Sequence, residues 1–195
     1  MTDKKNILYN IVGVGFMAAL VFVSSLISIP IPTMFGVSRI HLGNAFCLLS
    51  GFLLGGINGG LAAGIGSMLY DFTNPLYIAE SPITFINKFL MAYVCGRIMF
   101  SSRFPSQKKD ALRRIVAASS GALTYVVLYL LKNFINIVFF LKAEVMTAIV
   151  DLASTRLVTS LTNAAIAVII SVPLSIALNA ALKNGSALYR RLTKS

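Results

Sequence analysis

The stretch that decides the fold is residues 42–70, LGNAFCLLSGFLLGGINGGLAAGIGSMLY, which holds no charged residue in 29 positions. The run GGINGG at residues 55–60 predicts a turn, because glycine and asparagine favour tight backbone reversals. Each half then holds about 15 residues, or roughly 22 Å of helix. The hydrocarbon core of a bilayer is about 30 Å thick. The two halves are therefore either short membrane spans or a re-entrant hairpin.

The whole chain has the composition of a membrane protein. Its 195 residues are 57% hydrophobic and only 12% charged, whereas a soluble domain is nearer half apolar and a quarter charged. The mean hydropathy is +0.83. At roughly 20 apolar residues per helix, the length accommodates about five to seven spans. This excludes an attached ATPase domain, a large extracellular module and a long regulatory tail.

The apolar runs predict one all-α, polytopic membrane domain over residues 1–195. We place its spans at about 7–29, 41–55, 59–73, 82–100, 115–140 and 156–182. Pro30 and Pro32 end the first span, and Pro82 suits the first turn of the fourth. Pro173 should kink the sixth. The first run is too long for a signal peptide and lacks a small-residue cleavage site.

The charges orient these spans. Seventeen Lys and Arg residues against six acids give a net charge of +11. The cations form no stripe with interleaved aromatics, so we expect no nucleic-acid partner. Basic residues cluster near both ends and in the loop 101–114, which the positive-inside rule assigns to the cytoplasm. Two basic ends require an even number of spans, so residues 42–70 are interpreted as two, with both termini cytoplasmic.

Sequence motifs for catalysis are missing. The chain has no GxxxxGK[ST], HExxH or GxSxG motif, and His41 is its single histidine. Cys47 and Cys95 each lie alone in an apolar run, where packing is the simplest role. We therefore predict no catalytic residue, no metal site and no cofactor, so the protein is not expected to be an enzyme.

Polar residues instead gather in the predicted outer half of the membrane. A charge at membrane depth is costly and usually faces a partner or a wet cavity. If the topology is right, these residues share one depth and form a polar cup open to the outside. We take as the candidate substrate-binding set Arg39, Asp71, Asn74, Asn87, Lys88, Lys132, Asn133, Arg156 and Asn163.

Simpler roles exist for the same residues. Asp71 and Lys88 could form a structural ion pair, and Lys132 and Arg156 could snorkel toward the headgroups. The loop around Pro30 and Pro32, with Arg39 and His41, could fold over the cup as a lid. Four aromatic residues could stack on a ligand ring or belong to the membrane-interface belt; they are Tyr70, Phe72, Tyr77 and Phe85.

Small residues mark the first span. Gly15 and Ala19 lie four positions apart, so they stack on one helix face and permit close helix approach. They could pack inside this protein or receive a partner helix. Together with Ala18 they form the candidate docking surface.

Three motifs resemble one known family. Residues 15–23 read GFMAALVFV and precede IPIP at 29–32; residues 66–72 read GSMLYDF; residues 82–89 read PITFINKF. Together they resemble the substrate-binding S components of energy-coupling factor (ECF) transporters, particularly the riboflavin-type group. The resemblance covers nearly the whole chain.

The resemblance implies a bacterial plasma-membrane subunit that captures a vitamin or precursor, such as riboflavin, pyridoxine or hydroxymethylpyrimidine. A transmembrane coupling subunit and two ATPase subunits would then drive uptake, with membrane lipid around the S component. In the family an AxxxA-like motif on the first span docks the coupling subunit, and Gly15–Ala19 is the matching stretch here. The alternatives are a self-sufficient carrier or channel, and a small intramembrane enzyme using Asp71 and His41.

Overall fold

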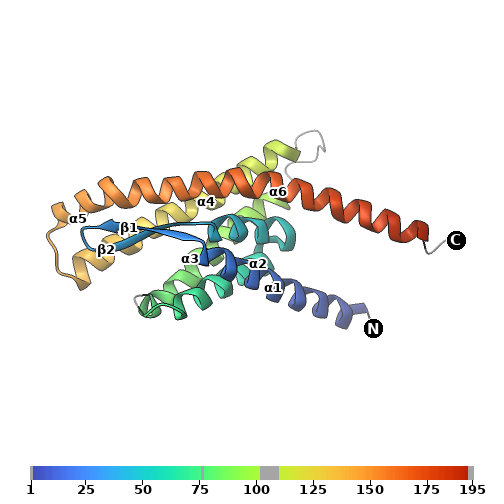
Figure 1. Ribbon diagram of the computed structural model, residues 1–195, viewed down its shortest axis with the longest axis horizontal. Helices are drawn as coiled ribbons and strands as arrows, with labels where there is room; N and C mark the ends of the chain where they lie inside the picture. The colour runs from blue at the N-terminus through green and yellow to red at the C-terminus, as the bar shows by residue number, and fades with distance from the viewer. Residues whose placement is uncertain (1, 76, 102–109, 193–195) are drawn as a thin grey trace.

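The computed structural model describes residues 2–75, 77–101 and 110–192 (Figure 1). The expected basic loop 101–114 therefore lies largely outside the described residues. The chain is mainly helical, with α1 (Thr2–Leu26), α2 (Gly43–Phe72), α3 (Ser81–Met99), α4 (Asp110–Ile135), α5 (Val145–Asp151) and α6 (Leu157–Leu192). Short π-helical segments, η3 (Asn136–Phe140) and η4 (Leu152–Arg156), extend α4 and precede α6, and a 3₁₀ turn, η1 (Ile78–Glu80), precedes α3.

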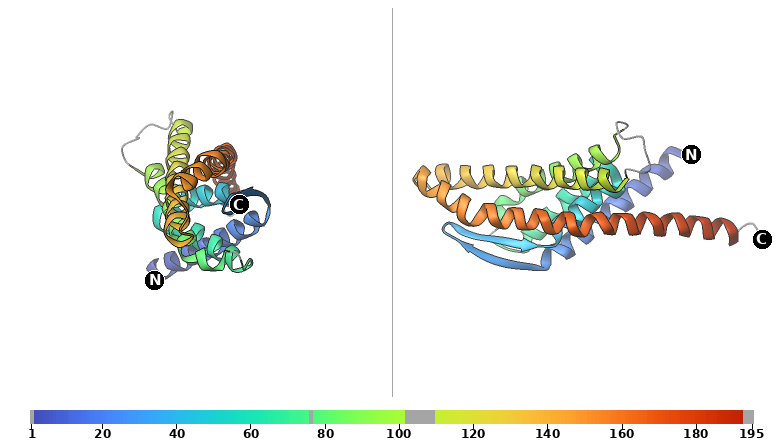
Figure 2. Two further views of the ribbon diagram at one scale, coloured as in Figure 1. Left: turned by 90° about the vertical axis from the view of Figure 1, so that its left-hand side faces the viewer. Right: turned by 90° about the horizontal axis from the view of Figure 1, so that it is seen from above.

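The helices cover the apolar runs from which six spans were predicted, but their ends differ from the predicted bounds. Helix α1 begins before residue 7 and ends at Leu26, and α6 continues through Pro173 to Leu192. Among the described residues, three helical stretches are long and apolar enough to cross a membrane: Gly43–Phe72, Asp110–Phe140 and Val145–Ala181. The start of α1 and the end of α6 lie at one end of the molecule, and the η3–α5 turn lies at the other (Figures 1 and 2).

Helix α2 reverses direction at Gly55. This glycine has φ +81° and ψ −170°, a backbone conformation that L side chains rarely adopt. The Ser50 hydroxyl donates to the Gly59 carbonyl at 2.8 Å, although nine residues of continuous helix would separate them by about 13 Å. The sequence-predicted turn is therefore present, and α2 consists of two antiparallel halves.

The glycines of α2 permit this close packing. A Cβ at Gly51 would lie 2.6 Å from the Ala92 carbonyl oxygen of α3, and one at Gly64 would lie 2.7 Å from the Phe85 ring. A Cβ at Gly66 would collide with the carbonyl oxygen of Ala18 on α1. The recurrent glycine spacing therefore reflects contacts of α2 with α3 and α1.

The expectation of an entirely α fold was wrong between α1 and α2. Residues there form an antiparallel β hairpin, β1 (Ser28–Thr33) and β2 (Gly36–His41), where a loop was expected. The Leu42 N–H donates to the Ile27 carbonyl at 3.3 Å. Since hydrogen-bonded pairs alternate in an antiparallel ladder, Pro30 and Pro32 occupy the positions whose N–H would point away from β2. Proline removes those donors from the free edge, which is why a strand tolerates both.

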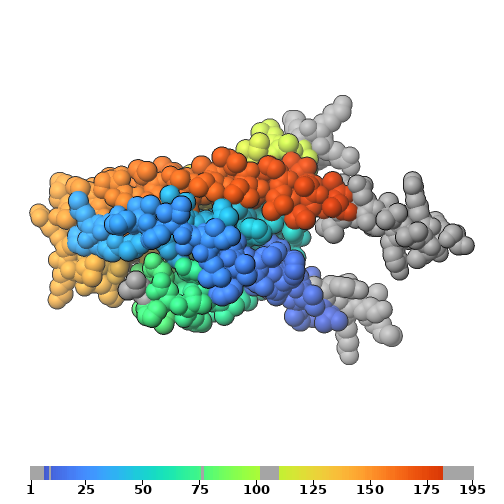
Figure 3. Space-filling model, viewed as in Figure 1, coloured from blue at the N-terminus to red at the C-terminus, as the bar shows by residue number. Residues whose placement is uncertain are grey.

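The hairpin covers one face of the helices. Figure 3 shows this segment in blue, with α6 in orange above it and a green segment below it. The buried core lies underneath, where α2, α3, α4 and α6 meet; it includes Leu48, Phe52, Met91, Cys95 and Val126. Both cysteines are buried and free, in keeping with a packing role.

Candidate ligand cavity

A cavity of about 340 Å³ lies beneath the hairpin. Its walls come from β2, the end of α2, the start of α3, the second half of α4 and the start of α6. A volume of this size suits a small organic ligand. Residues from these five elements are distant in sequence, so only the tertiary fold brings them together.

Eight of the nine candidate substrate-binding residues line this cavity: Arg39, Asp71, Asn87, Lys88, Lys132, Asn133, Arg156 and Asn163. Asn74 is not among the lining residues; it lies in the turn after α2, where its carbonyl accepts from the Tyr77 N–H at 2.9 Å. These eight side chains do not all have the same role. Some form their hydrogen bonds within the protein, and others have polar atoms that face the cavity.

Arg156 and Asp151 hold the tip of the hairpin. The Arg156 Nε lies 2.6 Å from Asp151 Oδ2, and its Nη2 lies 2.9 Å from the Thr33 hydroxyl. Asp151 Oδ1 accepts from the Met34 N–H at 2.9 Å. The remaining nitrogen, Nη1, donates to Asn133 Oδ1 at 2.6 Å. All three guanidinium nitrogens of this buried arginine are therefore engaged inside the protein, and we call the Arg156–Asp151 pair the hairpin latch.

Asn163 and Ser38 hold the rest of β2. The Asn163 side chain accepts from the His41 N–H at 3.0 Å and donates to the Arg39 carbonyl at 2.6 Å. It thus occupies the free edge of β2 as a neighbouring strand would. The Ser38 hydroxyl lies 2.8 Å from the Tyr129 hydroxyl of α4. These contacts keep the hairpin closed over the cavity.

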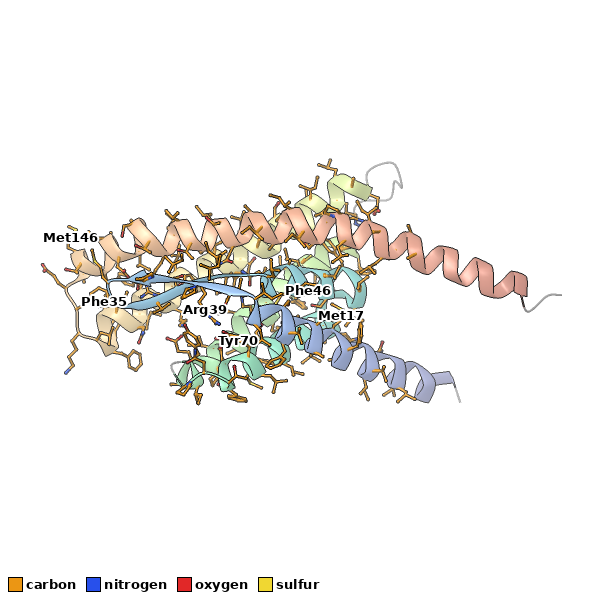
Figure 4. The ribbon with its side chains drawn as sticks, in the orientation of Figure 1. Met17, Phe35, Arg39, Phe46, Tyr70 and Met146 are labelled. Atoms are coloured by element: carbon orange, nitrogen blue, oxygen red, sulfur yellow. The ribbon has the colours of Figure 1, made fainter. Side chains whose placement is uncertain are left out.

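Arg39 points from β2 toward the end of α2 (Figure 4). Its guanidinium carbon lies 4.3 Å from the ring centroids of both Tyr70 and Tyr77, which is within cation–π range. Nη2 lies 3.7 Å from Asp71 Oδ1, and Nη1 is buried without a hydrogen-bond partner. Burial, the largest cause, raises the pKa of Tyr77 from its ordinary value, so its hydroxyl stays protonated. Of the Arg39 guanidinium nitrogens, Nη1 is therefore available to donate to a ligand.

The alternative ion pair between Asp71 and Lys88 is absent, because Asp71 pairs with Arg39 instead. Lys88 is only 3% exposed. Its Nζ donates to Asn44 Oδ1 and lies 3.6 Å from the centroid of the Tyr125 ring. Among the described residues, no carboxylate lies within 4.0 Å of this ammonium group. Lys132, by contrast, pairs with Glu80.

Asn87 lies beside Lys88 on α3 and is 7% exposed. Within residues 2–75, 77–101 and 110–192, its side-chain amide makes no hydrogen bond. The buried Nδ1 of His41 also lacks a partner. Burial, followed by the charges of Lys88 and Arg39, lowers the pKa of His41 well below 6.5, so the imidazole is neutral. Among the described residues, four buried side-chain atoms lack a hydrogen-bond partner, and two of them, Arg39 Nη1 and His41 Nδ1, belong to residues that line this cavity.

Sequence reasoning missed several lining residues. Ser25, Ser67, Thr84, Tyr125 and Tyr129 come from helices whose apolar character hid single polar positions. Of the four aromatics considered for stacking, Tyr70 and Tyr77 line the cavity. Phe72 is 50% exposed, and Phe85 stacks on Phe89 with centroids 6.2 Å apart. The spacing of Tyr125 and Tyr129, one helical turn apart, could have indicated a shared face.

The candidate docking surface divides into two faces. Gly15 and Ala19 are exposed, and a Cβ at Gly15 would meet nothing within 4 Å. Their exposed neighbours on α1 are Val12 and Phe16. Ala18, by contrast, is buried against α2. Gly15 and Ala19 therefore do not pack against another described part of this chain.

Among the described residues, no group of three or more His, Cys, Asp or Glu side chains could hold a metal ion.

A family profile described as "ECF-type riboflavin transporter, S component" matches residues 5–180. The chain belongs to this family. A search of the curated proteins found no match. This membership supports a role as the vitamin-capture subunit of an ECF transporter, and the family is one of transporter components and not of enzymes.

Proposed function

We propose that this S component captures a planar vitamin of the riboflavin type from outside the cell, in the cavity under the β1–β2 hairpin. The observation that carries the proposal is the side-chain amide of Asn87, which faces a cavity beneath a closed hairpin and has no partner among the described residues. A polar group that faces a cavity without a protein partner needs water or a ligand to complete its hydrogen bonds.

The lining supports a flat, polar heteroaromatic ligand. Four tyrosines surround the cavity, Tyr70, Tyr77, Tyr125 and Tyr129. Their rings offer apolar faces and their hydroxyls offer hydrogen bonds, which is the combination such ligands need. We assign direct ligand contact to Arg39, Asn87 and Lys88. We assign Asn133, Arg156 and Asn163 to positioning the hairpin.

The sequence holds no phosphate-binding loop, so this chain is not expected to hydrolyse ATP itself. We propose that a coupling subunit and two ATPase subunits supply the energy for uptake in the bacterial plasma membrane. Six spans with both termini in the cytoplasm would place the hairpin outside and leave the Gly15–Ala19 face of α1 free for the coupling subunit. Small exposed residues at helical spacing permit that contact.

The binding test uses the purified full-length protein and riboflavin, measured by quenching of flavin fluorescence. Asn87→Ala should weaken binding by about 2- to 12-fold, because one lost hydrogen bond costs about 0.5–1.5 kcal/mol. Asn58→Ala is the matched control, since Asn58 lies near the turn of α2 and not in the cavity lining. Riboflavin that fails to bind the wild type, or that binds Asn87→Ala and Asn58→Ala equally, refutes the assignment.

The coupling test uses Ala19→Trp. Ligand binding by the isolated subunit should persist, whereas co-purification with the coupling module and energised uptake should be lost. Joint loss of binding and assembly would indicate that the substitution damages the fold. Uptake that needs no ATPase subunit would instead favour the self-sufficient carrier.

A further inference from the structure

The charged residues around the cavity do not balance. Three of the four lining cations have a carboxylate partner: Arg39 with Asp71, Lys132 with Glu80, and Arg156 with Asp151. The fourth is Lys88, and no described carboxylate lies within 4.0 Å of it. The side chains around the cavity therefore carry one buried positive charge in excess.

The partners of Lys88 do not neutralise it. Asn44 contributes a carbonyl dipole and Tyr125 the face of its ring. An ammonium group has three donors, of which Asn44 occupies one. Lys88 also lies about 10 Å along α3 from Ser81, so it cannot easily reach water at the membrane surface. A buried cation that lacks a counterion is costly, and an anion in the cavity would remove that cost.

A second donor among the lining residues comes from β2. Arg39 Nη1 is buried without a hydrogen-bond partner, and its only described carboxylate contact is the 3.7 Å approach of Nη2 to Asp71. Unlike Arg156, this guanidinium is not fully engaged inside the protein. The cavity thus has unfilled cationic donors on α3 and on β2.

We propose that the cavity selects ligands carrying an oxyanion, either a phosphate ester or a carboxylate, with Lys88 as the residue that senses the charge and Arg39 Nη1 as a second donor. The proposal rests on the proposed function and narrows its ligand class. For a flavin, it means that an anionic derivative is preferred over neutral riboflavin.

The experiment compares three ligands: riboflavin, riboflavin 5′-phosphate, and the flavin whose terminal ribityl alcohol is oxidised to a carboxylate. We expect one or both anionic ligands to bind the wild type at least about 10-fold more tightly than riboflavin. Lys88→Met should weaken their binding by about 10- to 100-fold, the range for a charged hydrogen bond. Riboflavin offers Lys88 no negative charge and should lose less affinity, so the ratio of anionic to neutral affinity should fall, whereas Lys88→Arg should preserve that ratio. The anionic ligand that gains more affinity over riboflavin shows whether the cavity prefers a phosphate ester or a carboxylate.

A matched control removes a charge pair that is already neutral. The double variant Lys132→Met/Glu80→Gln keeps the cavity's net charge and should leave the ratio of anionic to neutral affinity within about 3-fold of wild type. Thermal melting of each variant in detergent separates loss of fold from loss of binding. Where Lys88→Met does not fold, Lys88→Gln with the same three ligands takes its place.

Two results would overturn the proposal. In the first, riboflavin binds as tightly as both anionic flavins. In the second, Lys88→Met weakens the binding of all three ligands by the same factor, as expected if Lys88 contacts ring carbonyls.

Should no flavin bind, the riboflavin-type function fails and the charge hypothesis is tested alone. Inorganic phosphate or acetate should then raise the melting temperature of the wild type but not of Lys88→Met, and equal responses would refute it.

Discussion

Replacing Arg156 with Met tests whether the hairpin latch is structural. The substitution keeps an apolar stem of similar length but leaves the Asp151 carboxylate buried without its counter-charge. The Arg156 side chain is 5% exposed and that of Asp151 is 0% exposed. Breaking a buried pair on one side costs about 3–5 kcal/mol. At about 2–4 °C per kcal/mol for a chain of this size, the melting temperature should fall by roughly 6–20 °C.

Lys132→Met is the comparison, because it also breaks an ion pair at the cavity. Lys132 and Glu80 are 15% and 34% exposed, so their pair is worth about 0–1 kcal/mol. The melting temperature should fall by no more than about 4 °C. The double variant Arg156→Met/Asp151→Leu should recover part of the loss, since apolar replacement of a buried pair is often neutral. The Met34 N–H would still lose its acceptor, leaving a cost of about 1–3 kcal/mol.

The assay is thermal melting of the purified variants in one detergent, with ligand affinity measured on the folded fraction. The structural assignment predicts a large loss of stability and little change in affinity for Arg156→Met. The reasoning is refuted if Arg156→Met melts no lower than Lys132→Met while its ligand affinity falls. Arg156 would then act on the ligand and not on the hairpin.

Three further predictions concern packing, pH and topology. Gly66→Ala should destabilise the protein by about 1–3 kcal/mol, because its Cβ would collide with the Ala18 carbonyl, whereas Gly15→Ala should stay within about 0.5 kcal/mol in the same melting assay. His41 has a lowered pKa, so below about pH 6.5 the unfolded chain binds a proton that the folded chain does not; wild type should lose melting temperature between pH 7 and pH 5, and His41→Gln should lose less. In intact cells, an impermeant thiol reagent should label a cysteine at Ala79 in the turn before α3 but not one at Leu112 near the start of α4, and the reverse pattern would invert the topology.

Much of the helical architecture could be predicted from the sequence, because it depends on local composition. Long charge-free runs become helices since their apolar side chains cannot face water, and GGINGG reverses the chain where Gly55 adopts a positive φ. Polar residues in otherwise apolar helices indicated the cavity, and eight of the nine chosen residues line it. The β hairpin was missed because two prolines usually argue against a strand; they fit here since β1 is a free edge.

Only the tertiary structure decided which polar residues are already satisfied. Arg156 and Lys88 look alike in sequence, as single cations beside apolar runs. Arg156 is neutralised by Asp151 and bonded to Thr33, 123 residues away, whereas Lys88 has only Asn44 and the Tyr125 ring. Composition and spacing describe each segment alone, so they place a charge at a depth in the membrane. Whether that charge meets a partner depends on contacts between distant segments, which form only when the hairpin folds over the helices.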